Sequence, residues 1–216
     1  MTLSFREILV FFLSAILGSI PFAIVIGKVF YGVDVRKQGS GNPGATNTLR
    51  VLGKKAGIAV LLLDIGKGAL AVFLGYRLVH FRSASIIYAD PDIIYPCICA
   101  ALAVLGHVFS PFLKFKGGKG VATSIGVVLA LQPIAALVMI VTFILILMFT
   151  RYVSLGSIIG AVIYPLYNLI FYTHSLVLLL FSIGLAALIL IRHKDNIARL
   201  IKGQESKFGK KQEAAV

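Results

Sequence analysis

Six long apolar segments constrain this chain more than any other feature of its sequence. They cover residues 8–27, 57–79, 93–109, 120–149, 153–172 and 176–191. A helix needs roughly 20 apolar residues to cross the hydrocarbon core of a bilayer, and all but one of the segments are near that length. Only 13% of the residues are charged, and the mean hydropathy is +0.97. This balance excludes a soluble globular protein, a disordered chain and a DNA-binding domain, so we expect an all-α integral membrane protein.

The segment 120–149 is too long for one crossing and contains Gln132-Pro133 at its centre, where proline should break the helix. Short loops rich in Lys and Arg stay in the cytoplasm. There are three basic regions: one after the first segment, one at Lys114–Lys119 and one at the C-terminal end. All three lie on the same side of the membrane only if 120–149 crosses twice. The sequence therefore predicts seven transmembrane helices, with a short pair, 120–131 and 134–149, broken at Gln132-Pro133. The N-terminus would lie outside and the C-terminus in the cytoplasm, and whether 120–131 spans fully or is re-entrant stays open.

The formal net charge of +13 would indicate a nucleic-acid partner in a soluble protein. Here the basic residues lie between apolar segments, so they indicate topology and anionic ligands, and we expect no nucleic-acid partner. Residues 1–207 should form one transmembrane domain, and residues 208–216 a basic, disordered tail. Cys97 and Cys99 lie two apart in an apolar run, so we expect two buried apolar thiols without a disulfide. No cluster of metal-ligand residues is evident, so we expect no metal and no cofactor.

The first polar region, Ser40–Arg50, follows the first apolar segment and reads S-G-N-P-G-A-T-N-T-L-R. Its glycines allow the backbone to approach a ligand closely. Its hydroxyl and amide groups can donate to oxyanions, and its arginine can bind a phosphate through two hydrogen bonds. A polar turn with a topology-determining arginine would have the same composition. The residues that could bind or orient a substrate here are Ser40, Asn42, Thr46, Asn47 and Arg50.

The second polar region, Gly106–Gly120, reads G-H-V-F-S-P-F-L-K-F-K-G-G-K-G and opens the apolar segment that begins at Val121. Successive backbone N–H groups and a helix N-terminus both favour an anion, so this loop is typical of a phosphate cradle. The spacing of a P-loop is absent. The alternative is a basic turn at the membrane interface. The candidate phosphate-binding residues are Lys114, Lys116, Gly117, Gly118, Lys119 and Gly120.

The third polar region covers residues 192–207 and reads R-H-K-D-N-I-A-R-L-I-K-G-Q-E-S-K. If it is helical, His193 and Asn196 share a face. The alternative is a basic amphipathic tail on anionic lipid. Inside the second apolar segment, Asp64 and Lys67 are three residues apart. Because ionisable groups at membrane depth are costly and usually paired, we expect them to form a neutralising pair that orders the helix near the site.

Together, and in this order on one side, the three regions resemble the bacterial acyl-phosphate:glycerol-3-phosphate acyltransferase family, PlsY. The resemblance extends from the first apolar segment to Lys207. It implies that residues 1–207 are an acyltransferase domain of the bacterial inner membrane, with the active site at the cytoplasmic face. The implied reaction transfers a fatty acyl group from acyl phosphate to the 1-hydroxyl of sn-glycerol 3-phosphate. The products would be lysophosphatidic acid and inorganic phosphate, in the first acylation step of phospholipid synthesis.

The resemblance also implies roles for individual residues. Those needed for activity are Ser40, Arg50, His193 and Asn196; those that bind glycerol phosphate are Gly117, Gly118 and Gly120; Glu205 is needed for structural integrity. No histidine has an aspartate five residues later, the acid–base motif of the more widespread glycerolipid acyltransferases. The proton of the hydroxyl must therefore leave by another route. His193 could accept it, or a phosphate oxygen of the substrate could; we favour the second, because basic neighbours disfavour protonation of His193.

The main alternative is a small membrane transporter of phosphorylated metabolites. A short broken helix whose N-terminus faces an anion is also a feature of transporters. Alternating access would need polar groups from both sides of the membrane, whereas these motifs gather on one. A membrane adaptor that binds lipid headgroups would account for the basic loops but not for the glycines. The sequence leaves the acyl-chain preference and the oligomeric state open, with a monomer as one option.

Overall fold

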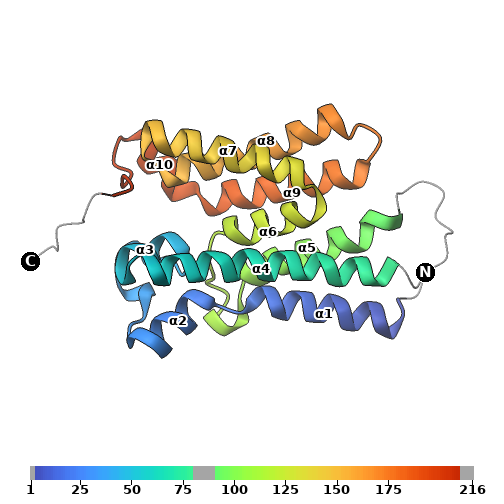
Figure 1. Ribbon diagram of the computed structural model, residues 1–216, viewed down its shortest axis with the longest axis horizontal. Coiled ribbons are helices and arrows are strands. Elements are labelled where there is room, and N and C mark those ends of the chain that lie inside the picture. The colour runs from blue at the N-terminus through green and yellow to red at the C-terminus, as the bar shows by residue number, and fades with distance from the viewer. Residues whose placement is uncertain (1–2, 80–90, 210–216) are drawn as a thin grey trace, which may run out of the picture.

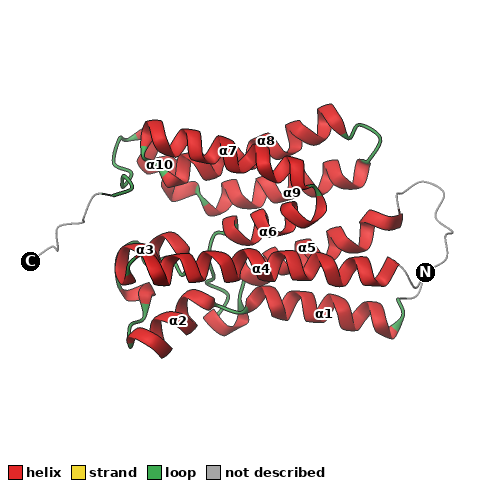
Figure 2. Cartoon of the chain, in the orientation of Figure 1, coloured by secondary structure: helices red, strands yellow, loops and turns green. Residues whose placement is uncertain are grey.

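The computed structural model describes residues 3–79 and 91–209, and this part of the chain contains helices and no strand (Figures 1 and 2). The helices are α1 (Phe5–Ser19), α2 (Phe22–Tyr31), α3 (Ala45–Leu52), α4 (Lys54–Val79), α5 (Pro91–Val108), α6 (Val121–Leu131), α7 (Pro133–Thr150), α8 (Val153–Phe171), α9 (Leu176–Arg192) and α10 (Lys194–Ile201). Two single 3₁₀ turns lie at Val35–Lys37 and Pro111–Leu113. The predicted all-α class is confirmed.

The long helices run side by side along the long axis of the molecule (Figure 1). α4 packs against α5 and α6, α1 packs against α5, and α7, α8 and α9 pack in sequence. The main core lies between α6 and its neighbours, and a smaller core lies beneath α2 and α3. Leu113, from the second polar region, is buried in this smaller core with Val35 and Val60. The loop before α6 is therefore anchored beside the segment that carries the first polar region.

Four helices are long and apolar enough to cross a membrane by length and composition: α4, α5, α7 and α8. Two bent pairs, α1 with α2 and α9 with α10, raise the number to as many as six. α6 is apolar but has only 11 residues. Many large apolar side chains on these helices are exposed, as lipid-facing surfaces require. The helices α3 and α10 lie at the same end of the molecule, opposite the start of α1 (Figure 1).

The first apolar segment, predicted as one span over 8–27, is divided into two helices. α1 ends at Ser19 and α2 begins at Phe22, with a bend of 48° between them. The cause is Pro21, which has no N–H to donate and whose ring disfavours continuation of the preceding helix. The sequence prediction of one span over 8–27 did not include this bend, and the two parts together can still make one crossing.

The predicted break at Gln132-Pro133 is confirmed, since α6 ends at Leu131 and α7 begins at Pro133. The side chain of Gln132 is buried, and both its nitrogen and its oxygen form a hydrogen bond. Its amide group donates to Asn168 Oδ1 at 2.9 Å, and its oxygen accepts from the hydroxyl of Tyr164 at 2.8 Å. Both partners come from α8. The break is thus fixed by a hydrogen-bonded polar cluster as well as by proline.

Cys97 and Cys99 are buried and form no disulfide, as predicted. The loop expected at 80–92 and the basic tail expected at 208–216 fall largely outside the described residues, which end at 209.

Candidate active site

The second and third polar regions meet at the start of α6, although they lie far apart in the sequence. The ammonium of Lys119 donates to Asn196 Oδ1 across 77 residues. The guanidinium of Arg192 donates to the carbonyl of Gly117 at 3.1 Å across 75 residues. The predicted helix at the third region is α10, so Asn196 lies on it next to the glycine-rich loop. The sequence predicted only that the two regions share a membrane side, and these contacts show that they touch.

Glu205 holds this junction together. One carboxylate oxygen accepts from the amide of Asn196 at 2.6 Å and from the hydroxyl of Ser154 at 2.7 Å. The other accepts from Arg199 Nε at 2.7 Å. Burial raises the pKa of Glu205, but the three hydrogen bonds and the charge of Arg199 outweigh it and lower the pKa below its usual value. An ionised Glu205 therefore ties α10 to α8 and orients Asn196, which fits the structural role that the resemblance implies.

Lys119 is half-buried, immediately before α6. Burial lowers the pKa of Lys119 to about 8, and the positive charges of Arg199 and Arg192 act in the same direction against the opposing pull of Glu205. The side chain thus stays mostly protonated at neutral pH and loses its charge as the pH rises through about 8.

His193 is buried at the joint between α9 and α10. Its Nδ1 lies 2.8 Å from the carbonyl oxygen of Ile189. Because a carbonyl can only accept, Nδ1 must carry the proton, which leaves Nε2 as an acceptor. Burial, followed by the charge of Lys119, lowers the pKa of His193 to about 4. The imidazole is therefore neutral at physiological pH, and the main cause is burial, whereas the sequence indicated only the basic neighbours.

The glycines of the second region serve close packing more than anion binding. The N–H of Gly117 donates to the carbonyl of Val108 at 3.0 Å, and that of Gly118 to the carbonyl of His107 at 3.2 Å. A Cβ on Gly117 would lie 2.0 Å from His107 O, so a side chain has no room. These two amides are not available to an anion, which differs from the predicted cradle of successive N–H groups. Gly120 directly precedes α6 as its N-cap and has a φ of +84°, a conformation that glycine adopts without strain.

The first turn of α6 offers other donors. The hydroxyls of Thr123 and Ser124 and the Nε of Arg192 are buried and have no hydrogen-bond partner within the described residues. Buried polar atoms without partners are rare and costly. A helix N-terminus favours negative charge, so a bound anion would satisfy this end of α6. The sequence placed Thr123 and Ser124 in the first turn, but only burial in the fold distinguishes them as candidates.

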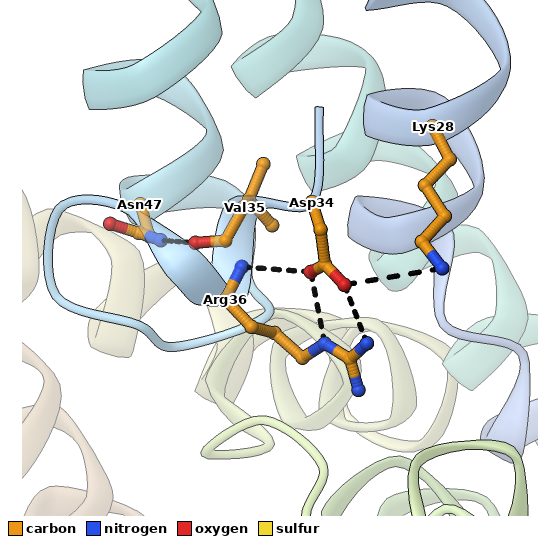
Figure 3. Close-up of polar contacts among 5 residues, drawn as sticks. All are labelled: Lys28, Asp34, Val35, Arg36 and Asn47. Carbon is orange, nitrogen blue, oxygen red and sulfur yellow. Dashed lines mark hydrogen bonds and ion pairs between the residues drawn. The ribbon is translucent and has the colours of Figure 1, made fainter. Parts of the chain in front are cut away.

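In the first polar region, Asn47 holds the loop together (Figure 3). Its amide oxygen accepts from the N–H of Ser40 at 2.8 Å, and its amide nitrogen donates to the carbonyls of Val35 at 2.8 Å and Gln38 at 3.2 Å. The side chain is 1% exposed. Its role in the structure is therefore to shape the loop, and direct contact with a ligand, which we predicted, does not fit this placement.

The same loop carries an ion pair between Asp34 and Arg36 (Figure 3). Arg36 donates to both oxygens of Asp34, at 2.9 and 2.6 Å, and Lys28 lies 4.0 Å away. The hydrogen bond from the Arg36 side chain lowers the pKa of Asp34 to about 2. Asp34 therefore stays ionised, and the charge of Arg36 balances it, so the pair adds little repulsion toward an anion nearby.

Arg50 lies in the last turn of α3, half-buried, with no hydrogen bond or ion pair to any residue that the structure describes. Asn42 and Thr46 are half-buried, and Ser40 is exposed. Pro43, between them, lines a small cavity together with His107 and Gly118, which brings the first region next to the second. The lysines at 114 and 116 are exposed on the adjoining loop.

The predicted pair of Asp64 and Lys67 is present in α4. Lys67 Nζ lies 2.7 Å from Asp64 Oδ1, and the two side chains are 1% and 2% exposed. No group of three or more His, Cys, Asp or Glu side chains suited to a metal ion occurs among residues 3–79 and 91–209.

Comparison with known proteins decides the family. The sequence model described as glycerol-3-phosphate acyltransferase matches residues 8–203, which include all three polar regions. This chain belongs to that family. A glycerol-3-phosphate acyltransferase 2 from Bacillus anthracis is 45% identical over 202 residues, covering 94% of this chain and 99% of the relative.

Two solved structures of PlsY (YgiH), an integral membrane glycerol 3-phosphate acyltransferase, have the same fold. The glycerol 3-phosphate form gives a TM-score of 0.84 at 38% identity and covers 94% of this chain and 96% of that one. The lysophosphatidic acid form gives 0.81 at 37% identity, with 94% and 95% covered. The predicted PlsY resemblance is confirmed, and the chain is a multi-pass membrane protein of this acyltransferase family.

Proposed function

We propose that this protein transfers a fatty acyl group from acyl phosphate to the 1-hydroxyl of sn-glycerol 3-phosphate. The products are lysophosphatidic acid and inorganic phosphate, and the reaction begins phospholipid synthesis. The observation that carries the proposal is the junction at α6, where Lys119 joins Asn196 and Glu205 beside unpartnered buried donors. This arrangement suits phosphate, and family membership supplies the acyl-transfer chemistry.

The reaction needs no covalent intermediate. Acyl phosphate is a mixed anhydride, so its carbonyl carbon is already activated. The hydroxyl oxygen of glycerol 3-phosphate attacks that carbon, the bond from the carbon to the phosphate oxygen breaks, and the hydroxyl proton leaves with the phosphate. The protein must hold two anions close together and stabilise the charge on the departing phosphate.

The positive charges and donors of the site divide this work. We assign phosphate binding to Arg50, Lys119 and the first turn of α6, including the hydroxyls of Thr123 and Ser124. Ser40, Asn42 and Thr46 orient the ligands from the first region, while Lys114 and Lys116 attract anionic substrates to the interface. Asn47 shapes the loop that presents them, and Asn196 directs Lys119.

The proton route follows from His193. Since the pKa of His193 lies at about 4, the neutral imidazole is a weak base at physiological pH. Its Nε2 can accept a hydrogen bond from the attacking hydroxyl and fix its direction. The oxygen that takes the proton is then a phosphate oxygen of the substrate, which becomes the inorganic phosphate.

We also propose seven crossings, with the N-terminus outside and the C-terminus in the cytoplasm of a bacterial inner membrane. The bent pair of α1 and α2 would make the first crossing, and α4 to α9 the other six. α3 and α10 lie at one end of the molecule, and both carry basic residues that favour the cytoplasm (Figure 1). A single copy contains every residue assigned above, so a monomer suffices for the site.

The test uses purified protein in detergent with palmitoyl phosphate and glycerol 3-phosphate. We expect lysophosphatidic acid to form only when both are present, and Arg50→Ala to abolish it. Arg77→Ala, at an exposed position in the last turn of α4, is the matched control and should keep full activity. No product from folded protein would refute the proposal; uptake of labelled glycerol 3-phosphate into vesicles would then support the transporter.

A further inference from the structure

A buried polar cluster inside the helical bundle borders the glycine-rich turn of the site, and no role in the proposed reaction has been assigned to it above. Lys67 and Asp64 face each other on α4, and the last turn of α5 adds His107, which is 8% exposed. The ammonium of Lys67 lies 2.9 Å from His107 Nδ1, and that nitrogen lies 3.6 Å from Asp64 Oδ1. Three ionisable side chains from α4 and α5 thus lie in contact with one another in the buried interior.

Lys67 also reaches the break in the first apolar segment. Its ammonium donates to the carbonyl of Ile20 at 2.9 Å, between α1 and α2. Two of its hydrogens can therefore serve Ile20 and His107. Asp64 Oδ1 lies 2.7 Å away as the partner of an ion pair, so two hydrogen bonds and one counter-charge define the place of the ammonium.

The lysine also fixes the state of the histidine. A charged ammonium has no acceptor, so His107 Nδ1 must accept and the ring proton must lie on Nε2. The other edge of the ring lies against the glycine-rich turn. A Cβ on Gly118 would come within 2.2 Å of His107 Nε2, while the carbonyl of His107 accepts the N–H of Gly118 at 3.2 Å. The turn is therefore packed directly on a ring that Lys67 orients.

The contact between these parts is tight. The cavity shared by Ile20, Pro43, His107 and Gly118 has a volume of ≈ 10 Å³. That is about the space of one water-sized probe, too little for a ligand. A shift of the imidazole would therefore move Gly118, and with it the neighbouring Lys119 at the start of α6.

We infer that Asp64, Lys67 and His107 form a positioning unit, which sets the glycine-rich turn and so places Lys119 and the first turn of α6 for phosphate. The unit touches no substrate and acts through the turn. This inference rests on the proposed function in assigning phosphate to α6. Charged groups buried at membrane depth are costly and are usually paired or functional. Here they connect α4, the break between α1 and α2, and the glycine-rich turn after α5.

The test compares two variants in which a neutral amide side chain replaces His107. His107→Asn puts an amide oxygen near the position of Nδ1 and keeps an acceptor for Lys67, whereas His107→Gln reaches toward the Nε2 position instead. We expect His107→Gln to raise the KM for glycerol 3-phosphate at least tenfold per folded molecule, and His107→Asn to stay within about threefold. His174→Gln, at an exposed histidine in the loop between α8 and α9, is the control and should leave KM unchanged.

A second readout does not depend on activity. Amide hydrogen exchange in the peptide covering 113–124 should be at least tenfold faster in His107→Gln than in His107→Asn. Equal KM values and equal exchange in the two variants would overturn the positioning role. If the unmodified protein makes no lysophosphatidic acid, the proposed function fails, while the exchange comparison still decides whether His107 sets the turn.

Discussion

At the scale of single residues, the site depends on how burial and neighbouring charge set protonation. His193 is held neutral, so it accepts a hydrogen bond without adding to the positive charge. Lys119 is mostly charged at neutral pH, but its pKa of about 8 means that a small rise in pH removes the charge. Glu205 stays ionised because three donors surround it, and it offsets part of the positive charge nearby. One carboxylate, one neutral imidazole and several cations together fit a site for anions.

The pKa of Lys119, at about 8, leads to a pH dependence of known sign. Deprotonation would remove the cation to which we assign phosphate binding, so kcat/KM for glycerol 3-phosphate should fall as pH rises through about 8. In Lys119→Arg the guanidinium stays charged, and the alkaline fall should disappear. The measurement is kcat/KM from pH 6 to 10, with Lys202→Arg, on the exposed surface, as the control. An unchanged alkaline fall in Lys119→Arg would contradict this assignment.

The residues that carry chemistry could be found from the sequence, but not all their partners. Lys119 and Asn196 stood out because a glycine-rich turn and a polar amphipathic stretch are unusual next to apolar segments, whereas Glu205 was indicated by the family resemblance alone. Ser154 gave no such signal, since one serine at the start of an apolar helix has an ordinary packing role. The contacts that decide its function cross 51 residues, and only the fold brings them together.

At the scale of elements, the short helix α6 places the site. It begins after the glycine-rich loop, ends shortly before Pro133 and packs mainly against α4, so the loop that precedes it is held against the bundle. The break was predictable from Gln132-Pro133, because proline has a local effect. The division of the first segment at Pro21 was equally local, but apolar residues on both sides made it look like one helix. The hydrogen-bonded cluster that fixes Gln132 was not predictable, since its partners lie on α8.

Gln132 offers a test at this scale. Gln132→Leu removes a donor and an acceptor and leaves the amide of Asn168 and the hydroxyl of Tyr164 without that partner inside the bundle. Unsatisfied buried groups of this kind cost about 1–3 kcal/mol each, so the free energy of unfolding should fall by at least that amount. Thermal unfolding in detergent measures it, with Gln204→Leu, at an exposed position after α10, as the control. Equal melting temperatures for the two variants would show that the cluster does not stabilise the break.

At the scale of the whole molecule, α3 and α10, which both carry basic residues, lie at one end (Figure 1). Many large apolar side chains along the helices are exposed. The class of fold was predictable because the bilayer demands long apolar helices. The predicted number of crossings depends on which basic loops share one side of the membrane. By length and composition alone, four helices can span, or up to six if each bent pair is one span, and α6 is shorter than these.

The topology can be tested by labelling single cysteines in spheroplasts with a membrane-impermeant maleimide. Cys97 and Cys99 are first replaced by alanine, and cysteine is introduced at exposed positions at opposite ends, Thr173→Cys or Lys202→Cys. We expect Thr173→Cys to react in intact spheroplasts and Lys202→Cys only after permeabilisation. The reverse pattern, or reaction of both in intact spheroplasts, would refute the proposed orientation.

The identity of the acyl donor is the most decisive property to measure. Purified protein would receive glycerol 3-phosphate with palmitoyl phosphate, palmitoyl-CoA or palmitoyl carrier protein, without added metal, and lysophosphatidic acid and inorganic phosphate would be measured together. Our account predicts equal amounts of both products from palmitoyl phosphate and no product from either thioester. Lysophosphatidic acid made from a thioester at a comparable rate, or without matching phosphate release, would contradict it.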